Sequence, residues 1–342
     1  MAAQRTPFDL AAVRREFPVV ERCIYLNHAA VGPISRWVHR AMIARSDLQM
    51  EQVDRAGELS APIYRKGRES AARLVGATPE RIAYVQNTSH GLSLVADGID
   101  WREGDNLVVP AAEFPSNYLV WKTLESKGVV LRHWPLVEGR LTTDGLQGLV
   151  DARTRVVAVS QVQFDNGFKC ELAAIGAVCQ SHDALLVVDG TQSVGAMAID
   201  IAATGVDALV VSAHKWMLGP LGIGFMALSD RAFERIEVHF VGWLSVKEPF
   251  QFRRDLDLLP TAERFEPGTE NGAGIYGLTA RLEEIEEIGL EAIEGRILAL
   301  NDGLAEAVRK MGYVIASPWG ACERSGILTF KHPTIASETL LH

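Results

Sequence analysis

Short apolar runs alternate with helix-like segments along most of the chain. The runs expected to form strands are 81–85, 106–110, 129–134, 154–160, 184–189, 207–212 and 222–228. The segments between them with helical spacing are 89–98, 117–126, 171–181 and 230–238. Alternation of strands and helices is typical of a doubly wound sheet. The pattern therefore predicts an α/β fold with a mostly parallel seven-stranded sheet.

Further helical patterns lie on both sides of this region. They cover 35–50 and 60–75 before the sheet, and 275–293 and 296–311 after it, followed by a strand near 326–331 and a helix start at 333–341. We expect a large α/β domain over 21–274 and a small α+β domain built from 1–20 and 275–342. Residues 337–342, SETLLH, have the pattern of a first helical turn without a capping glycine. The small domain is therefore expected to be incomplete at its carboxyl end.

Composition narrows the class of protein. The net charge of -9 disfavours a general nucleic-acid or acidic-membrane surface. The first residues have no signal-peptide pattern, and no apolar run approaches a membrane-spanning length. Cys23, Cys170, Cys179 and Cys322 have neither metal-ligand spacing nor a disulfide pattern. We expect a soluble cytoplasmic protein that holds no metal.

Candidate chemistry is concentrated where two of the apolar strands end. One strand delivers Asp189, and the next delivers Lys215 into a glycine-rich turn. Ligands of open α/β sheets bind at the carboxyl ends of strands. This position disfavours the alternative that Asp189 only caps a turn and that Lys215 is an ordinary surface charge. A lysine that forms a Schiff base and an acid that keeps a pyridine nitrogen protonated are the two groups that pyridoxal phosphate requires. Lys215 and Asp189 are therefore the predicted catalytic residues, with that cofactor.

Several polar groups could hold the cofactor's phosphate. Ser212 and His214 precede Lys215 and can share one face of the strand end, although an isolated histidine is more often a core residue. Thr88 and Ser89 follow a strand and open a helix. Hydroxyls and free amides at a helix start form a phosphate site, and the alternative is a plain helix cap. We predict that these four residues bind the phosphate.

Other strand ends carry candidates for the pyridine ring. Phe114 could stack on the pyridine ring. Alternatively, Phe114 is a core residue that is followed by Pro115 at the first position of a helix. Gln192 lies three residues after Asp189 and can reach the ring hydroxyl. Gln163 and Asn166, in SQVQFDNG, have the same potential role. The loop 264–274, which contains Thr269, could equally be an interdomain linker.

Together these segments resemble the class V aminotransferase and cysteine desulfurase family of fold type I pyridoxal phosphate enzymes. The resemblance runs from YLNHAAVGP at 25–33 to RSGILTF at 324–330 and is most specific in VVDGTQSVG and VSAHKWMLGPLGIGFM. It implies that Asp189 pairs with the pyridine nitrogen and Gln192 with the ring hydroxyl. It also implies a homodimer in which Gly268 and Thr269 reach the partner subunit's phosphate.

The resemblance differs between branches of the family. Typical cysteine desulfurases have a histidine at the position of Phe114, whereas FPS and LNHAAVGP are similar to the isopenicillin N epimerase-like branch, and FPS also to kynureninases. A phenylalanine cannot shuttle protons as a histidine does. The family's carboxylate-binding arginine and the desulfurases' nucleophilic cysteine are expected beyond His342, and Cys322 does not match the latter.

These features leave three functions open, in order of preference. The first is an enzyme that acts on an amino acid by epimerisation, side-chain elimination or transamination. The second is a cysteine desulfurase or selenocysteine lyase. The third is a homologue that binds the cofactor but is catalytically silent, which the apparent loss of the carboxylate clamp would favour.

Overall fold

The central element is one seven-stranded sheet in a computed structural model that describes residues 9–340. Its strands are β1 (Ile82–Val85), β2 (Asn106–Pro110), β3 (Val130–Trp134), β4 (Thr154–Ser160), β5 (Leu185–Asp189), β6 (Ala208–Ser212) and β7 (Gly224–Leu228). They lie in the order β1-β7-β6-β5-β4-β2-β3. Only β7 runs antiparallel to its neighbours β1 and β6. The predicted mostly parallel sheet is confirmed.

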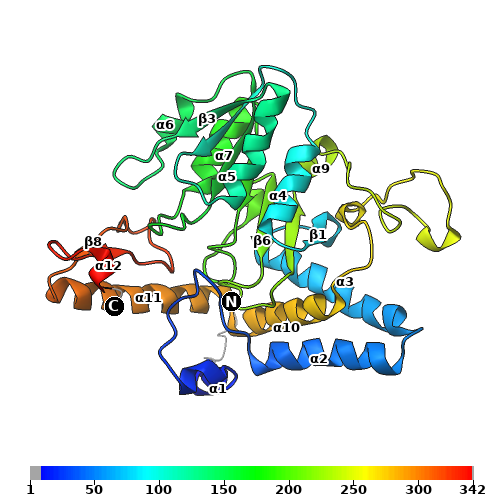
Figure 1. The fold of residues 1–342 in the computed structure, drawn as a ribbon, viewed down its shortest axis with the longest axis horizontal. Coiled ribbons are helices and arrows are strands. Elements are labelled where there is room, and N and C mark those ends of the chain that lie inside the picture. Colours follow the sequence, from blue (N-terminus) through cyan, green and yellow to red (C-terminus); the bar gives the residue numbers. More distant parts are fainter. Residues whose placement is uncertain (1–8, 341–342) are drawn as a thin grey trace, which may run out of the picture.

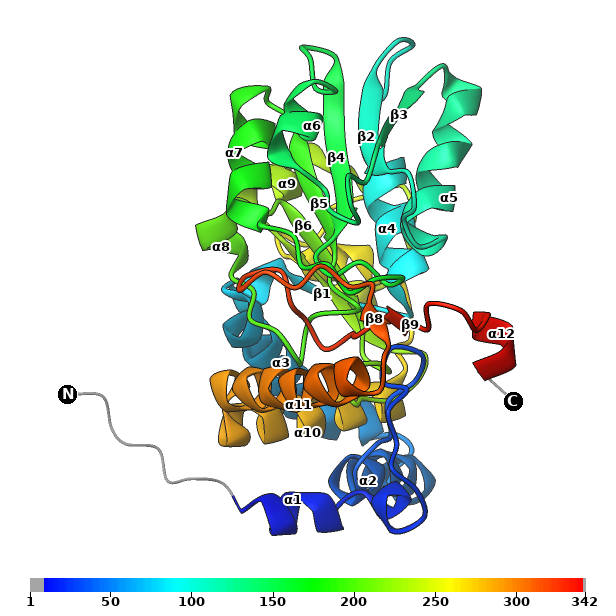
Figure 2. The same ribbon diagram turned by 90° about the vertical axis from the view of Figure 1, so that its left-hand side faces the viewer.

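Helices cover both faces of the sheet (Figures 1 and 2). One face carries α4 (Thr88–Asp97) and α5 (Ser116–Lys122), and the other α6 (Thr143–Gln147), α7 (Leu172–Ser181) and α8 (Ile201–Thr204). A short helix, α9 (Asp230–Arg235), follows β7. Leu185 and Val187 of β5 enter the core on one face, and Leu186 and Val188 enter the core on the other. A strand apolar on both faces is buried from both sides, which explains the continuous apolar runs.

A layer of long helices lies below the sheet in Figure 1. It consists of α2 (Arg36–Glu51), α3 (Ala56–Val75), α10 (Gly272–Ile288) and α11 (Leu290–Lys310). Helix α10 packs against α2 and α3. The helix predicted over 275–293 ends early because Gly289, at φ 91°, adopts a conformation that favours glycine. The predicted domain boundary at 274 falls inside the first turn of α10, and the two-domain division stays a prediction.

The remaining elements lie at the two ends of the described chain. The amino-terminal helix α1 (Leu10–Arg15) is followed by a short 3-10 helix, η1 (Pro18–Glu21), and an irregular segment that reaches α2. At the other end, β8 (Val314–Ile315) pairs antiparallel with β9 (Phe330–Lys331), and α12 (Ser337–Leu340) follows. The strand expected near 326–331 is therefore only its last two residues.

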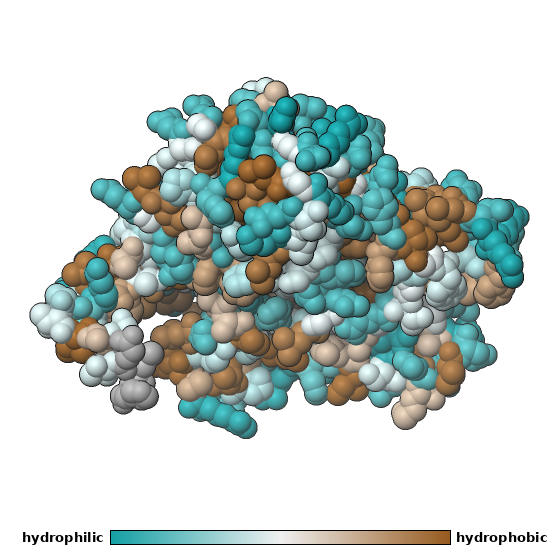
Figure 3. Space-filling view, turned by 45° about the horizontal axis from the view of Figure 1, so that its top comes forward, coloured by the Kyte–Doolittle hydropathy of each residue, from teal (hydrophilic) through white to brown (hydrophobic). Residues whose placement is uncertain are grey.

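One segment, 238–258, projects from the body of the molecule on the right of Figure 1. Its exposed apolar side chains include Phe240, Trp243, Phe250, Phe252 and Leu256, and brown patches mark this side in Figure 3. All four cysteines are free thiols. Among residues 9–340, no helix is both long and apolar enough to cross a membrane.

Candidate active site

A cavity of about 150 Å³ lies at the carboxyl ends of β4, β5 and β6. The structure brings most of the sequence-predicted site residues together around it. They are Thr88, Ser89, Phe114, Asp189, Gln192, Ser212, His214 and Lys215. Parallel strands all end at the same edge of the sheet, so residues distant in sequence converge there.

Asp189 is the last residue of β5 and is only 5% exposed. Its Oδ1 accepts a hydrogen bond of 2.8 Å from the backbone N–H of Thr191. Burial raises the pKa of Asp189, and the positive charge of Lys215 partly opposes that shift. The acid is thus oriented by the chain and shares the cavity with the lysine.

Lys215 follows β6 and lines the same cavity. Its Nζ lies 4.9 Å from the centroid of the Phe114 ring, whose edge-to-face neighbour is Phe164. Burial lowers the pKa of Lys215, and Asp189 partly opposes this effect. A lower pKa increases the fraction of neutral amine, the form that acts as a nucleophile or base.

A cluster of hydroxyl groups forms one end of the cavity. Thr88 Oγ1 lies 2.6 Å from Thr191 Oγ1 and 2.7 Å from Ser212 Oγ, and the Thr88 N–H donates to Ser212 Oγ. Thr88 begins α4, whose cap is the Asn87 side chain. His214 lines the same cavity, and burial, then the charge of Lys215, lowers its pKa. Hydroxyls at a helix N-terminus offer the donors that a phosphate needs.

Gln192 connects the cavity to the amino-terminal segment. Its Nε2 donates to the Ala29 carbonyl at 3.0 Å, and its Oε1 accepts from Trp216 Nε1 at 2.9 Å. The Trp216 ring in turn stacks on His28. One amide hydrogen of Gln192 is left for a ring hydroxyl, because an amide nitrogen carries two donors.

Four predicted residues lie outside this cavity. Gln163 is buried and donates to the Ser160 carbonyl at 3.2 Å, and Asn166 donates to the Gly139 carbonyl at 2.8 Å. Each amide therefore donates to a backbone carbonyl of the protein, and the expectation that they reach the ring stays a prediction. Gly268 and Thr269 line a different cavity, of about 460 Å³.

Sequence reasoning missed three residues beside the cavity. Thr191 joins Asp189 to the hydroxyl cluster. Ser160 lines the cavity and donates its Oγ–H to Glu113 at 2.7 Å. Buried Glu113 also accepts from the backbone N–H groups of Phe114 and Ser160, both at 2.8 Å. Burial raises the pKa of Glu113. The sequence signal that could have identified Glu113 is an acid shortly after an apolar strand, similar to the pattern that identified Asp189.

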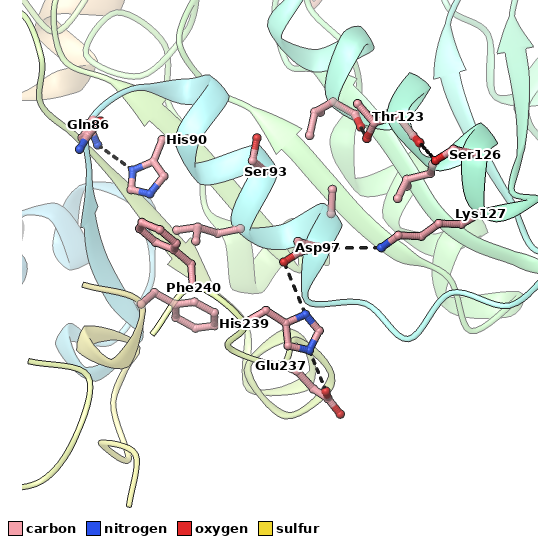
Figure 4. A pocket seen from close by; sticks show the side chains of 15 residues that line it. Gln86, His90, Ser93, Asp97, Thr123, Ser126, Lys127, Glu237, His239 and Phe240 are labelled. Atoms are coloured by element: carbon pink, nitrogen blue, oxygen red, sulfur yellow. Dashed lines mark hydrogen bonds and ion pairs between the residues drawn. The ribbon is translucent and has the colours of Figure 1, made fainter. Parts of the chain in front are cut away.

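A larger cavity, of about 610 Å³, lies along α4 from His90 to Asp97 and includes none of the predicted cofactor residues (Figure 4). A line of ion pairs crosses it, in which Asp97 contacts Lys127 at 3.9 Å and His239 at 3.5 Å. His239 also contacts Glu237 at 3.1 Å. The charged groups of this larger cavity already contact one another, and none of them belongs to the predicted cofactor site. The size of a cavity alone therefore does not identify the active site.

The residues of the smaller cavity fit pyridoxal phosphate group by group. Asp189 suits a pyridine nitrogen, Lys215 an aldehyde carbon, Phe114 a flat ring, and the hydroxyl cluster a phosphate. The fold and this set of residues define an enzyme of the pyridoxal phosphate class with the fold type I architecture.

Comparison with known proteins gives the family. The model of the Aminotransferase class-V family matches residues 24–342, so the chain belongs to that family. Membership of this family confirms pyridoxal phosphate as the expected cofactor. The similarity to solved structures confirms the fold type I architecture expected from the sequence.

Individual relatives agree with this assignment. A probable cysteine desulfurase of Methanothermobacter thermautotrophicus is 32% identical over 86% of this chain and 75% of its own length. One of Pyrococcus abyssi is 30% identical over 97% of this chain and 83% of its own. The apo cysteine desulfurase of Thermococcus onnurineus NA1 superposes with a TM-score of 0.87 at 27% identity, over 99% of this chain and 86% of that one.

A more distant structure supports the fold alone. It is a C-DES variant with glycine covalently linked to its PLP cofactor, and it superposes with a TM-score of 0.89 at 22% identity. It covers 98% of this chain and 89% of its own.

Proposed function

We propose that this chain breaks the Cα–H bond of an amino acid, with Lys215 as the base, in an epimerisation, elimination or transamination. The observation that carries the proposal is the Lys215 amine, which lies 4.9 Å from the Phe114 ring centroid in the same cavity as Asp189. When bound, pyridoxal phosphate supplies an electron-withdrawing ring conjugated to the substrate Cα.

Lys215 has two tasks in this proposal. Its Nζ would hold the cofactor covalently, and its free amine would be the base that takes the proton from the substrate Cα. The lowered pKa of Lys215 favours the neutral amine for this transfer. Asp189, oriented by Thr191, keeps a proton on the pyridine nitrogen. The acid and the base thus act on opposite parts of one bound molecule.

The other residues bind and orient. Thr88, Ser89, Ser212 and His214 are the proposed phosphate ligands, supported by the hydroxyl cluster at the start of α4. Phe114 would pack on the ring and exclude water without exchanging a proton. Gln192 is the proposed partner of the ring hydroxyl.

Cysteine desulfuration is the second candidate, favoured by the names of the 32% and 30% identical relatives. Sulfur transfer to the protein requires a nucleophilic thiol within reach of the substrate. Of the four cysteines, all within residues 9–340, none lines the cofactor cavity, and Cys322 is exposed. We place epimerisation or another Cα–H reaction first because Phe114, which cannot shuttle protons as a histidine does, lines the cofactor cavity.

The test is hydrogen exchange at Cα. The protein is loaded with pyridoxal phosphate and incubated in D₂O with a panel of L- and D-amino acids, with NMR as the readout. Sulfide release from L-cysteine is measured in parallel, and Lys215→Ala is the control. Exchange without sulfide, or sulfide formed together with pyruvate and ammonia, supports the first function, whereas sulfide formed together with alanine supports the second. Cofactor binding without exchange or sulfide would favour the silent homologue.

We also propose a homodimer in which Gly268 and Thr269 complete the partner's phosphate site. Two observations support it: these residues line a cavity other than their own cofactor cavity, and the nearby segment 238–258 exposes apolar side chains. Mixing Lys215→Ala with Thr269→Ala chains tests the idea. Mixed dimers should regain Cα exchange that both pure variants lack or perform poorly. Failure to regain it would contradict shared sites.

A further inference from the structure

The turn that carries Lys215 is held by few bonds of its own. Within it, the Leu218 N–H donates to the Lys215 carbonyl at 3.0 Å, and the Gly219 N–H donates to the Ala213 carbonyl at 2.8 Å. Leu218 has φ 55°, in the left-handed region that a branched side chain rarely adopts. A strained turn persists only when its surroundings fix it, so the outside contacts of this turn matter.

One of those contacts is a buried arginine from the helical layer. Arg281 of α10 is 4% exposed, and its Nε donates to the Met217 carbonyl at 2.7 Å. Met217 lies two residues after Lys215 and between it and the strained Leu218. The guanidinium therefore fixes the backbone of the lysine turn from an element far away in sequence.

The guanidinium is itself fixed by a short chain of polar contacts. Arg281 Nη1 contacts Glu284 Oε2 at 3.0 Å, and Glu284 Oε1 accepts from Ser35 Oγ at 2.9 Å. Ser35 is 1% exposed and caps α2 by accepting from the Val38 N–H. Each member has a defined partner, so the arginine has one orientation.

The same amino-terminal segment also contacts the turn directly. The Gly32 N–H donates to the His214 carbonyl at 2.7 Å. A Cβ at Gly32 would overlap the Lys215 carbonyl and the Leu218 side chain. Gly32 and Arg281 thus each contact the backbone of the turn, one at His214 and the other at Met217.

A purely structural role for Arg281 is the simpler alternative. An Arg–Glu pair three residues apart on a helix needs no burial, and burying a guanidinium is unfavourable unless specific partners compensate. Burial lowers the pKa of Arg281, and Glu284 opposes that shift. The compensating partner that a surface pair would not have is the Met217 carbonyl of the lysine turn.

We propose that Arg281 is a positioning residue for Lys215: by fixing the Met217 carbonyl it sets the direction in which the Lys215 amine enters the cofactor cavity. This inference rests on the proposed role of Lys215. It predicts that loss of Arg281 slows the reaction of Lys215 with pyridoxal phosphate by more than the accompanying loss of stability explains.

The experiment compares Arg281→Met with a matched control, Arg231→Met. Arg231 likewise contacts a backbone carbonyl, Ala184 at 2.9 Å, and a buried carboxylate, Asp207 at 2.9 Å, with Asp183 at 3.2 Å as a second carboxylate, but at the amino ends of β5 and β6. The readouts are thermal unfolding without cofactor, the rate at which added pyridoxal phosphate acquires the absorbance of lysine-bound cofactor, and the pH dependence of that absorbance. Lys215→Ala defines the signal without attachment.

Both variants should lose stability, but only Arg281→Met should slow cofactor attachment, by about tenfold to a hundredfold, and shift its pH dependence. Arg281→Lys should restore part of the rate, because an ammonium can reach the carbonyl but cannot also hold Glu284 in a fixed fork. Glu284→Gln, which leaves the arginine in place, covers the case in which Arg281→Met does not fold, and should slow attachment by a few-fold.

Equal attachment rates in wild type, Arg281→Met and Arg231→Met would overturn the positioning role. If Arg281→Met does not fold, an unchanged rate in both Glu284→Gln and Arg281→Lys would overturn it equally. Failure of the wild type itself to gain the absorbance that Lys215→Ala lacks would instead overturn the proposed function. The two failures are therefore distinguishable.

Discussion

The two ends of the central sheet both bury charged side chains, but they use them differently. At the amino ends of the strands, Asp207 accepts from the Leu186 N–H, Ser229 and Arg231, all within 3.0 Å. At the carboxyl ends, Asp189 and Lys215 instead line a cavity. Buried polar groups are normally satisfied by the protein, so a set that faces a cavity indicates a ligand site.

This difference can be separated from simple burial. Burial raises the pKa of Asp207 as it does that of Asp189. A perturbed pKa alone therefore does not distinguish a structural acid from a catalytic one. The structural acid, Asp207, accepts hydrogen bonds from three protein groups, whereas the catalytic candidate, Asp189, lines a cavity that a ligand can enter.

The strongest test of the comparison is Lys215→Ala. We expect Cα–H exchange to fall by at least about 10³-fold, within the range attributed to a general base, while the fold persists. NMR-detected exchange and circular dichroism measure the two effects. Unchanged exchange would remove the catalytic role of the carboxyl end.

Asp189→Asn paired with Asp207→Asn tests the two acids directly. Asp189→Asn should slow exchange by about 10²-fold with little loss of stability, because it removes the charge that holds the pyridine proton. Asp207→Asn should destabilise by about 3 kcal/mol, because it removes a buried charge that accepts from the Leu186 N–H and pairs with the half-buried Arg231. It should spare the exchange rate of the folded fraction. Denaturant titration measures stability, and the exchange assay measures the rate. A stability loss in Asp189→Asn with slowed exchange in Asp207→Asn would contradict the assignment of Asp189 as the catalytic acid and Asp207 as the structural one.

Phe114→Leu probes the apolar wall of the cavity. Loss of an aromatic stack of about 0.5–1.5 kcal/mol should weaken cofactor affinity by about twofold to tenfold. Absorbance titration with pyridoxal phosphate gives the dissociation constant. Trp121→Phe, a fully buried residue of α5, serves as a control that should change stability rather than affinity. Unaltered affinity in Phe114→Leu would argue against ring stacking.

The smallest expected effect concerns stability without cofactor. Because the folded-state pKa of Lys215 lies below its unfolded value, the charged amine destabilises the folded protein below that folded-state pKa. The penalty fades as pH rises through the folded-state pKa towards the unfolded one. Lys215→Met should therefore stabilise the apoprotein at neutral pH, by at most about 1 kcal/mol since water partly screens the amine. Melting temperatures across pH would reveal it, and a pH-independent difference would contradict it.

Much of the fold followed from the sequence because the strands are apolar on both faces. The seven predicted apolar runs all form strands. Asp189 and Lys215 line one cavity because they lie at and just after the ends of neighbouring parallel strands, β5 and β6. Helix ends were less certain. The interruption at Gly289 depends on one backbone angle that an amphipathic pattern does not report.

Side-chain partners were the least predictable part of the site. Gln163 and Gln192 each lie three residues after the last residue of a strand. The Gln163 amide nevertheless donates to the nearby Ser160 carbonyl, whereas the Gln192 amide contacts Ala29 and Trp216. The choice depends on tertiary neighbours far apart in sequence. Arg281 is a stronger example, because nothing in the helical pattern of α10 indicates that one residue reaches the lysine turn.

The contact of Ser35 with Glu284 joins residues 249 positions apart and has a consequence for the order of synthesis. Residue 35 leaves the ribosome long before residue 284, so the amino-terminal segment cannot reach its final partner during most of translation. Contacts between such distant residues also slow folding, because a long loop must close before they stabilise anything. We therefore expect the nascent chain to complete its sheet first and to gain the ability to capture cofactor only after α10 has emerged.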